Sequence, residues 1–155
     1  MEPTELTRHD GYRISTDKAA LDRGVIHRYL SEDAYWSPGI PRELVDACID
    51  NSLLCFGLYA PDGAQAGFCR VLTDLGAIAY LGDVFVLGAH RGHGLGKWLV
   101  ATAVDHPALS RIRTFLLGTA DAHSLYERNG FGAIDASRWL IRRRTAEELY
   151  GSATV

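Results

Sequence analysis

The sequence LGDVFVLGAHRGHGLGKWLVATAV, residues 81–104, passes from an apolar run through a glycine-rich turn into a segment with helical periodicity. Three glycines stand at alternate positions, Gly92, Gly94 and Gly96, so backbone N–H groups of the turn can converge on one anion. The apolar residues that follow recur at helical spacing, and the N-terminus of a helix favours a phosphate. The stretch therefore predicts a strand, a phosphate-binding turn and a helix.

Two common nucleotide-binding motifs do not fit this turn. A dinucleotide fingerprint, G-x-G-x-x-G, needs a third glycine where the chain has Leu99. A Walker loop, G-x-x-x-x-G-K-[ST], needs a glycine at the position of Arg91 and a hydroxyl at the position of Trp98. Both nucleotide-binding interpretations are therefore rejected, and a dinucleotide oxidoreductase becomes a remote alternative.

The turn instead resembles the pyrophosphate loop of the GNAT superfamily of acetyl-CoA-dependent N-acetyltransferases, whose pattern is [RQ]-x-x-G-x-[GA]. Arg91, Gly94 and Gly96 match this pattern in place. A second motif of the family, A-x-x-x-Y-E-x-x-G-F, is matched downstream by Ala122, Tyr126, Glu127, Gly130 and Phe131. One strand-like run, residues 112–117, lies between the motifs, as the resemblance requires. The resemblance extends over residues 77–134.

The resemblance implies a fold of the α/β (α+β) class, in which a mixed, mostly antiparallel central sheet is flanked by helices and splays after its fourth strand. Apolar runs and turn signals predict strands at residues 12–16, 53–59, 67–72, 77–86 and 112–117. Helical spacing predicts helices around residues 20–30, 41–49, 95–106 and 120–129. Residues 131–134 and 139–141 are expected to form a last strand or hairpin, residues 142–155 a short terminal helix, and residues 1–10 a loose segment.

Composition narrows the class of protein. A chain of 155 residues that is 47% hydrophobic predicts a single domain over residues 1–155. The net charge of -3 argues against a nucleic-acid partner, and the absence of a long apolar run argues against a membrane partner. The polar start and three unpaired cysteines predict a cytoplasmic protein. The histidines show no metal-ligand spacing, so no metal is expected.

The resemblance implies that acetyl-CoA binds beside the glycine-rich turn. The backbone of Phe85 and Val86 would pair with the pantetheine arm, and the N–H of Val86 would polarise the thioester carbonyl. The pyrophosphate loop would consist of Arg91, Gly92, His93, Gly94, Leu95, Gly96 and Lys97. The family often has Asn, bonded to the CoA arm, at the position of Thr119, and this chain has a shorter hydroxyl there.

Two residues are candidates for proton transfer. The resemblance places Tyr126 near the departing sulfur, where its phenol would act as a general acid. Alternatively, Tyr126 packs on the sheet with its hydroxyl bonded to the backbone. Asp83 shares one face of its strand with Leu81 and Phe85, an unusual position for a carboxylate. Asp83 could be the base that accepts the proton of the amine, directly or through water, or it could pair with a neighbouring backbone group or an Arg as a structural element.

The acceptor is expected to bind beside an aromatic loop. Tyr35 and Trp36 lie in the loop between the first two predicted helices, and in this family that loop forms one wall of the acceptor site. Together with Asp83, they would suit an amine through cation–π contact and a charge pair. Packing in the core is the alternative for both aromatics. Asp121 is expected to cap the helix of Tyr126, and His123 to lie on its surface.

The sequence thus predicts an N-acetyltransferase that transfers an acetyl group from acetyl-CoA to a primary amine of a small molecule, or of a peptide or protein. Transfer would be direct, within a ternary complex, and the protein would be a monomer or a homodimer. The alternative is a CoA-binding sensor or regulatory module without catalytic activity. Retention of Tyr126 and Asp83 favours the enzyme.

Overall fold

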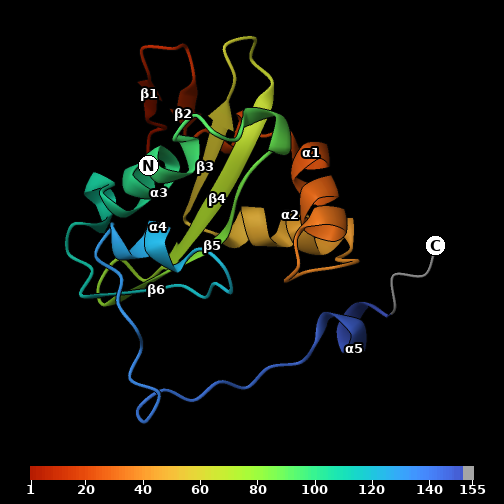
Figure 1. The fold of residues 1–155 in the computed structure, drawn as a ribbon, viewed down its shortest axis with the longest axis vertical. Coiled ribbons are helices and arrows are strands. Elements are labelled where there is room, and N and C mark those ends of the chain that lie inside the picture. The colour runs from red at the N-terminus through yellow and green to blue at the C-terminus, as the bar shows by residue number, and fades with distance from the viewer. Residues whose placement is uncertain (152–155) are drawn as a thin grey trace.

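A computed structural model describes residues 1–151, and their strands form one six-stranded sheet in the order β1-β2-β3-β4-β5-β6 (Figure 1). The strands are β1 (Glu5–Thr7), β2 (Arg13–Ser15), β3 (Leu54–Tyr59), β4 (Gln65–Thr73), β5 (Ile78–Val86) and β6 (Thr114–Leu116). The helices are α1 (Arg23–Arg28), α2 (Arg42–Asn51), α3 (Leu95–Val104), α4 (His123–Glu127) and α5 (Ala146–Tyr150). Neighbouring strands are antiparallel except β5 and β6, which are parallel. The predicted mixed, mostly antiparallel sheet is confirmed.

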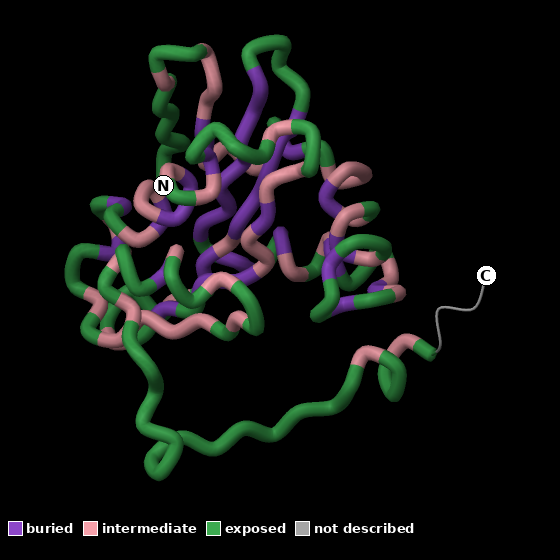
Figure 2. The backbone as a smooth tube through the Cα atoms, in the orientation of Figure 1, coloured by how far each residue is buried: buried purple, intermediate pink, exposed green. Residues whose placement is uncertain are grey.

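The sheet is covered on both faces, and this explains the nearly continuous apolar runs of its central strands. All six residues of β3 are buried. Phe56 and Leu58 pack in a cluster with α3, whereas Cys55 packs in a second cluster with α1 and α2. Figure 2 shows the buried central strands between these two helical layers. Within residues 1–151, no helix is long and apolar enough to cross a membrane.

The sheet opens between β5 and β6. These strands pair only from Ile78 to Tyr80, so the remainder of β5 has no strand partner on that side. Opposite Cys69 of β4, β5 carries a β-bulge that contains Asp83 and Val84. Asp83 adopts a left-handed backbone with φ of 53°. The predicted splay is confirmed, and it leaves main-chain groups of β5 available to a ligand.

The N-terminal segment differs from the prediction. Residues 1–10 were expected to be loose, but β1 pairs with β2 along the edge of the sheet. Arg13 also forms an ion pair with Glu5 at 2.9 Å. All three residues of β1 are exposed, so no alternation of apolar and polar residues reveals the strand.

The segment after α4 also differs. The strand or hairpin expected at residues 131–134 and 139–141 is absent, because these residues pair with no strand within residues 1–151. Residues 132–145, called the C-terminal arm here, instead run away from the body as an exposed segment (Figures 1 and 2). The arm leads to α5, which confirms the expected short terminal helix.

Candidate active site

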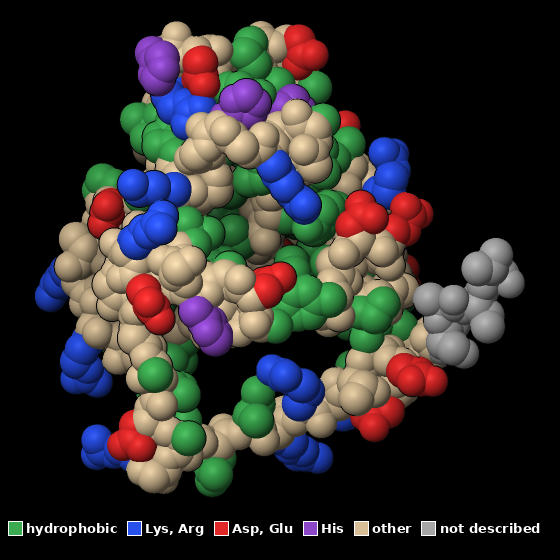
Figure 3. Space-filling model, viewed as in Figure 1, with side chains coloured by type: hydrophobic (Ala, Val, Ile, Leu, Met, Phe, Trp, Pro, Cys, Tyr) green, Lys and Arg blue, Asp and Glu red, His purple; other side chains and the backbone are tan. Residues whose placement is uncertain are grey.

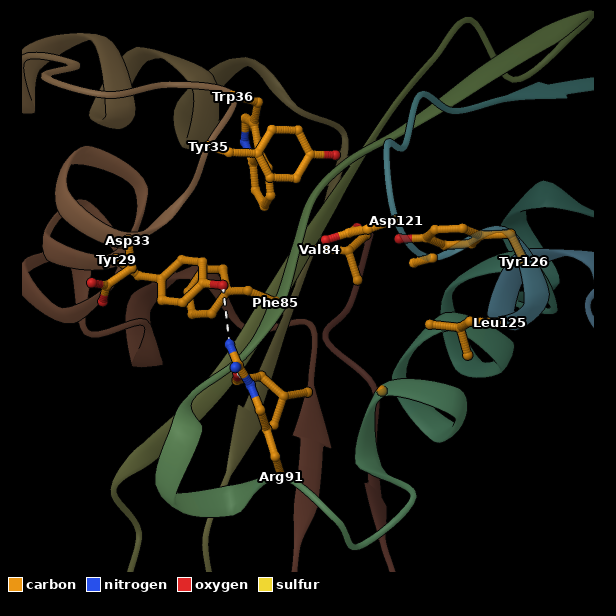
Figure 4. Close-up of a pocket in the computed structure, with 13 residues that line it drawn as sticks. Tyr29, Asp33, Tyr35, Trp36, Val84, Phe85, Arg91, Asp121, Leu125 and Tyr126 are labelled. Carbon is orange, nitrogen blue, oxygen red and sulfur yellow. Dashed lines mark hydrogen bonds between the residues drawn. The ribbon is translucent and has the colours of Figure 1, made fainter.

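A pocket of about 400 Å³ lies where β5 and α4 separate, and Figure 4 shows its walls. The connection between α1 and α2 forms one wall, β5 forms the floor, and α4 forms the opposite wall. The lining residues are Tyr29, Asp33, Tyr35, Trp36, Val84, Phe85, Val86, Arg91, Gly96, Asp121, Ala122, Leu125 and Tyr126. The pocket therefore joins segments that lie more than eighty residues apart in the sequence.

The glycine-rich turn presents free backbone donors beside this pocket. Gly94 has φ of 71° and directly precedes α3. The first bond of that helix runs from the N–H of Trp98 to the carbonyl of Gly94, so the N–H groups just before Trp98 have no helical acceptor. A Cβ at Gly92 would meet no atom within 4 Å, so the space above the turn is open. The turn fits an anionic group such as the pyrophosphate of CoA.

Arg91 connects the turn to the floor of the pocket. Its Nε donates to the carbonyl of Val86 at 3.0 Å, and its Nη2 donates to the hydroxyl of Tyr29 at 3.3 Å (Figure 4). Tyr29 in turn stacks on Phe85 with ring centroids 4.0 Å apart. The side chain of Leu95 is buried in the core, so only its N–H can face a ligand.

Tyr126 points its phenol from α4 toward the pocket (Figure 4). Its side chain is largely buried, yet the hydroxyl has no hydrogen-bond partner among the described residues. Burial raises the pKa of Tyr126 to about 12, so the phenol stays protonated at neutral pH. A protonated, unpartnered hydroxyl in this position can donate to a leaving group.

Asp83 is engaged with protein groups on both carboxylate oxygens. Oδ2 accepts from Nε of Arg70 at 2.7 Å, and Oδ1 accepts from Nε1 of Trp36 at 3.0 Å. The side chains of Asp83 and Arg70 are each only 14% exposed, and Asp83 is not among the lining residues of the pocket. Asp83 thus anchors the aromatic wall, and its role as a base stays a prediction.

Comparison with known proteins identifies the family. The profile of the Acetyltransferase (GNAT) domain matches residues 52–132. A Gibberella zeae protein, whose name assigns it as an acetyltransferase, is 31% identical over 149 residues, covering 83% of this chain and 82% of that protein. The chain belongs to the GNAT acetyltransferase family. Acetyl transfer is the activity that this family's description names, so the predicted family is confirmed.

Solved structures of GNAT proteins agree with this assignment. A GNAT-family acetyltransferase from Xanthomonas campestris is 43% identical, with a TM-score of 0.83, and the match covers 97% of this chain and 100% of that one. An acetyltransferase from Clostridium acetobutylicum, solved with acetyl-CoA, shares the fold at 14% identity, with a TM-score of 0.64 and coverage of 90% and 96%.

In this GNAT acetyltransferase, the two predicted aromatic residues form part of the pocket wall and also contact protein groups. The hydroxyl of Tyr35 accepts from the N–H of Ala120 at 2.8 Å, which ties the loop between α1 and α2 to the start of the α4 wall. Trp36 lies edge-on to Tyr35, with ring centroids 5.0 Å apart. Contact of both residues with the acceptor stays a prediction. Their hydrogen bonds to Ala120 and Asp83 fix the loop against the opposite wall and the floor of the pocket.

The residues before α4 divide their roles differently from the expectation. The hydroxyl of Thr119 accepts from the N–H of Ala122 at 3.1 Å, and Thr119 is not among the pocket-lining residues. The expectation that Asp121 caps the helix is wrong, because Ala122 is the N-cap residue of α4 and no side chain caps that helix. Asp121 lines the pocket instead. His123 is exposed, as predicted, and contact of Thr119 with CoA stays a prediction.

Sequence reasoning missed several lining residues of this GNAT acetyltransferase. Tyr29 fits the helical period of its segment, and this pattern alone does not indicate that it lines a pocket. Asp33 lies in a π-helical turn, Tyr29–Asp33, that extends α1 toward the pocket. Leu125, one position before Tyr126, also lines the pocket. An acidic residue two positions before the aromatic pair of Tyr35 and Trp36 was the available signal for Asp33.

Proposed function

We propose that this GNAT acetyltransferase transfers an acetyl group from acetyl-CoA to a primary amine of a small molecule, or of a peptide or protein. Transfer is direct, within a ternary complex. The observation that carries the proposal is the unpartnered phenol of Tyr126, which faces the pocket in the splay of the sheet beside the glycine-rich turn. In this arrangement the phenol can protonate the leaving thiolate, and the turn can bind the pyrophosphate of the same donor molecule.

The donor would be held mainly by backbone groups of this chain. Acetyl-CoA supplies an activated thioester when it binds. The N–H of Leu87 donates to Ala66 of β4, and the carbonyl of Val86 accepts from Arg91 instead. Because main-chain groups alternate between the two edges of a strand, the N–H of Val86 points away from β4 toward the splay. This N–H would support the thioester oxygen as charge develops on it.

The acceptor would be recognised by an acidic and aromatic surface. Asp33 and Asp121 line opposite walls of the pocket, together with the rings of Tyr29, Tyr35 and Trp36. Carboxylates attract an ammonium group, and aromatic faces bind cations when water is excluded. Such a surface favours amines over anionic acceptors.

The bound amine must lose a proton before it attacks, because a primary amine is mostly protonated at pH 7. Two carboxylates could accept this proton in the proposed mechanism. Asp83 would act through a water molecule, since its oxygens already bind Arg70 and Trp36. Asp121 lines the pocket itself and could act directly.

Variants of the two carboxylates separate these roles. Asp83→Asn is expected to lower the free energy of unfolding by about 3 kcal/mol, because it leaves the buried guanidinium of Arg70 without its charge partner. Whichever carboxylate is the base, its Asn variant should lose turnover most near neutrality and recover part of it as rising pH deprotonates the free amine. Turnover against pH, together with denaturant unfolding, measures both effects.

The matched control for Asp83→Asn is Arg70→Leu, which removes the same ion pair from the opposite strand. Arg70→Leu should lower stability to a similar extent while it keeps the Asp83 carboxylate, so a loss of turnover found only in Asp83→Asn belongs to the carboxylate and not to the lost ion pair. Wild-type profiles for both Asp83→Asn and Asp121→Asn would exclude both carboxylates as the base and leave Asp33, which also lines the pocket, or a water chain that ends elsewhere.

The proposed function is tested by screening pools of primary amines with purified protein and acetyl-CoA, with release of free thiol as the readout. At least one amine should release thiol well above the rate of the protein without acceptor. CoA binding by calorimetry is measured in parallel on the same protein. Tight binding with no thiol release across small amines and peptides would instead identify the CoA-binding sensor.

A further inference from the structure

The turn between β1 and β2, residues 8–12, lies against the glycine-rich turn. The hydroxyl of Tyr12 and Nδ1 of His90 share a hydrogen bond of 2.8 Å, and the ring of Tyr12 stacks on His93 with ring centroids 6.3 Å apart. In Figure 3, basic and histidine side chains gather at the end of the molecule where these two turns meet. The N-terminal edge of the sheet is therefore a neighbour of the proposed phosphate site, although nearly eighty residues separate the two turns in the sequence.

Arg8 is held in one orientation by this turn. Its N–H donates to the carbonyl of Tyr12 at 2.8 Å, and its carbonyl accepts from the N–H of Gly11 at 2.9 Å. The guanidinium carbon lies 5.8 Å from the ring centroid of Tyr12 and 5.4 Å from that of Trp98, within the range of cation–π contacts. Asp10 accepts from Nε at 3.0 Å and from Nη2 at 2.6 Å. The side chain is only 19% exposed, so these contacts fix the direction of its remaining nitrogen.

The remaining nitrogen of Arg8, Nη1, faces the glycine-rich turn. It makes no hydrogen bond with another residue in the described range, 1–151. It lies 3.9 Å from the position that a Cβ on Gly94 would occupy. The first turn of α3 contains no acidic residue that could neutralise this cation. Because the N-terminus of a helix is itself positive, a guanidinium is unfavourable there unless an anion is bound beside both.

We propose that Arg8 donates through Nη1 to a phosphate group of CoA held at the glycine-rich turn. The inference rests on the proposed function, since it assumes that the turn binds CoA. The phosphate belongs to the pyrophosphate or is the 3′-phosphate of the same molecule, and a guanidinium binds either through charge-assisted hydrogen bonds. Arg8 lies outside both motifs, residues 91–96 and 122–131, so the N-terminal strands add a donor-binding residue that the motifs do not contain.

Calorimetric titration with CoA tests the contact. Arg8→Met keeps an apolar stem against the two rings and removes the charge, so affinity for CoA should fall about tenfold or more. Arg8→Gln, which keeps a hydrogen-bond donor for Asp10, should lose affinity to a similar degree. Thermal unfolding of the same samples shows whether each variant is folded, and one folded variant is enough for the test.

The matched control is Arg13→Met. Arg13 belongs to the same pair of strands, forms an ion pair with Glu5, and lies 5.1 Å from the ring centroid of Tyr59. It directly follows Tyr12 on β2, so its side chain lies on the opposite face of the sheet. Arg13→Met should keep its affinity for CoA. Equal losses in Arg8→Met and Arg13→Met would overturn the proposal, because any disturbance of the two strands would then explain the effect.

Dephospho-CoA, which lacks only the 3′-phosphate, distinguishes the two phosphates. If Arg8 contacts the pyrophosphate, Arg8→Met should weaken CoA and dephospho-CoA by the same factor. If Arg8 contacts the 3′-phosphate, only the affinity for CoA should fall. Wild-type affinity for CoA in both Arg8 variants would overturn the inference and leave the proposed function intact. A wild-type protein that binds no CoA would instead contradict the proposed function itself.

Discussion

Replacing Tyr126 by Phe is expected to lower turnover about a hundredfold, while affinity for CoA stays within about twofold of wild type. The substitution removes only the hydroxyl, which has no partner among the described residues and faces the pocket. Because the pKa of Tyr126 is raised to about 12 by burial, the phenol holds its proton throughout the range in which amines titrate. Steady-state kinetics and calorimetric CoA titrations on the same protein measure the two quantities.

Tyr59→Phe is the matched control for this substitution. Tyr59 is also a buried tyrosine with an unpartnered hydroxyl, and burial raises its pKa to about 12, but it lies outside the pocket. As pH rises above 10, both tyrosines ionise in the unfolded chain before they ionise in the folded protein, so the free energy of unfolding falls between pH 10 and pH 12. Turnover of both variants should therefore be measured below pH 10. Full turnover in Tyr126→Phe would show that another group protonates the thiolate.

Gly94→Val should weaken CoA binding about a hundredfold or more, because a β-branched residue strongly disfavours a left-handed backbone with φ of 71°. Relaxation of that strain would turn the N–H groups of the loop away from their common anion site. Isothermal titration with CoA measures the loss, and circular dichroism reports whether the fold is retained.

Gly63→Val provides the control for backbone strain alone. Gly63 has φ of 90° at the tip of the turn between β3 and β4, and a Cβ there meets nothing within 4 Å. This variant carries a comparable left-handed penalty far from the pocket, so it should lose stability and keep its affinity for CoA. If Gly94→Val, Gly63→Val and the wild type bind CoA with equal affinity, the glycine-rich loop is not part of the CoA site.

The central part of the fold could be predicted because its local patterns agree with its tertiary structure. All six residues of β3 and the first five of β4 are buried, and the glycine-rich turn starts α3 at the expected position. The two ends could not be predicted in this way. The strand β1 is specified by main-chain pairing and by contacts such as Arg13 with Glu5, not by apolar alternation. Residues 139–141 have the pattern of a strand but pair with no strand in the described part of the chain.

The candidate site was predictable where a motif fixes spacing and unpredictable where the fold brings distant residues together. Tyr126 and the glycine-rich turn were found because each belongs to an ordered motif. Asp33 reaches the pocket because a π-helical turn extends α1, and the only local signal for it is its place two positions before the aromatic pair. The bond between Arg70 and Asp83 spans two strands at a bulge, so the register of the sheet decides it.

The division of the pocket between two parts of the chain has an evolutionary consequence. The proposed donor site depends on backbone groups of β5 and the turn before α3, whereas the proposed acceptor wall consists of side chains in the connection between α1 and α2. Loops tolerate substitution better than buried strands. Residues 29–36 can therefore diversify toward new amines while the donor site is inherited unchanged, which would let one scaffold supply acetyltransferases for many acceptors.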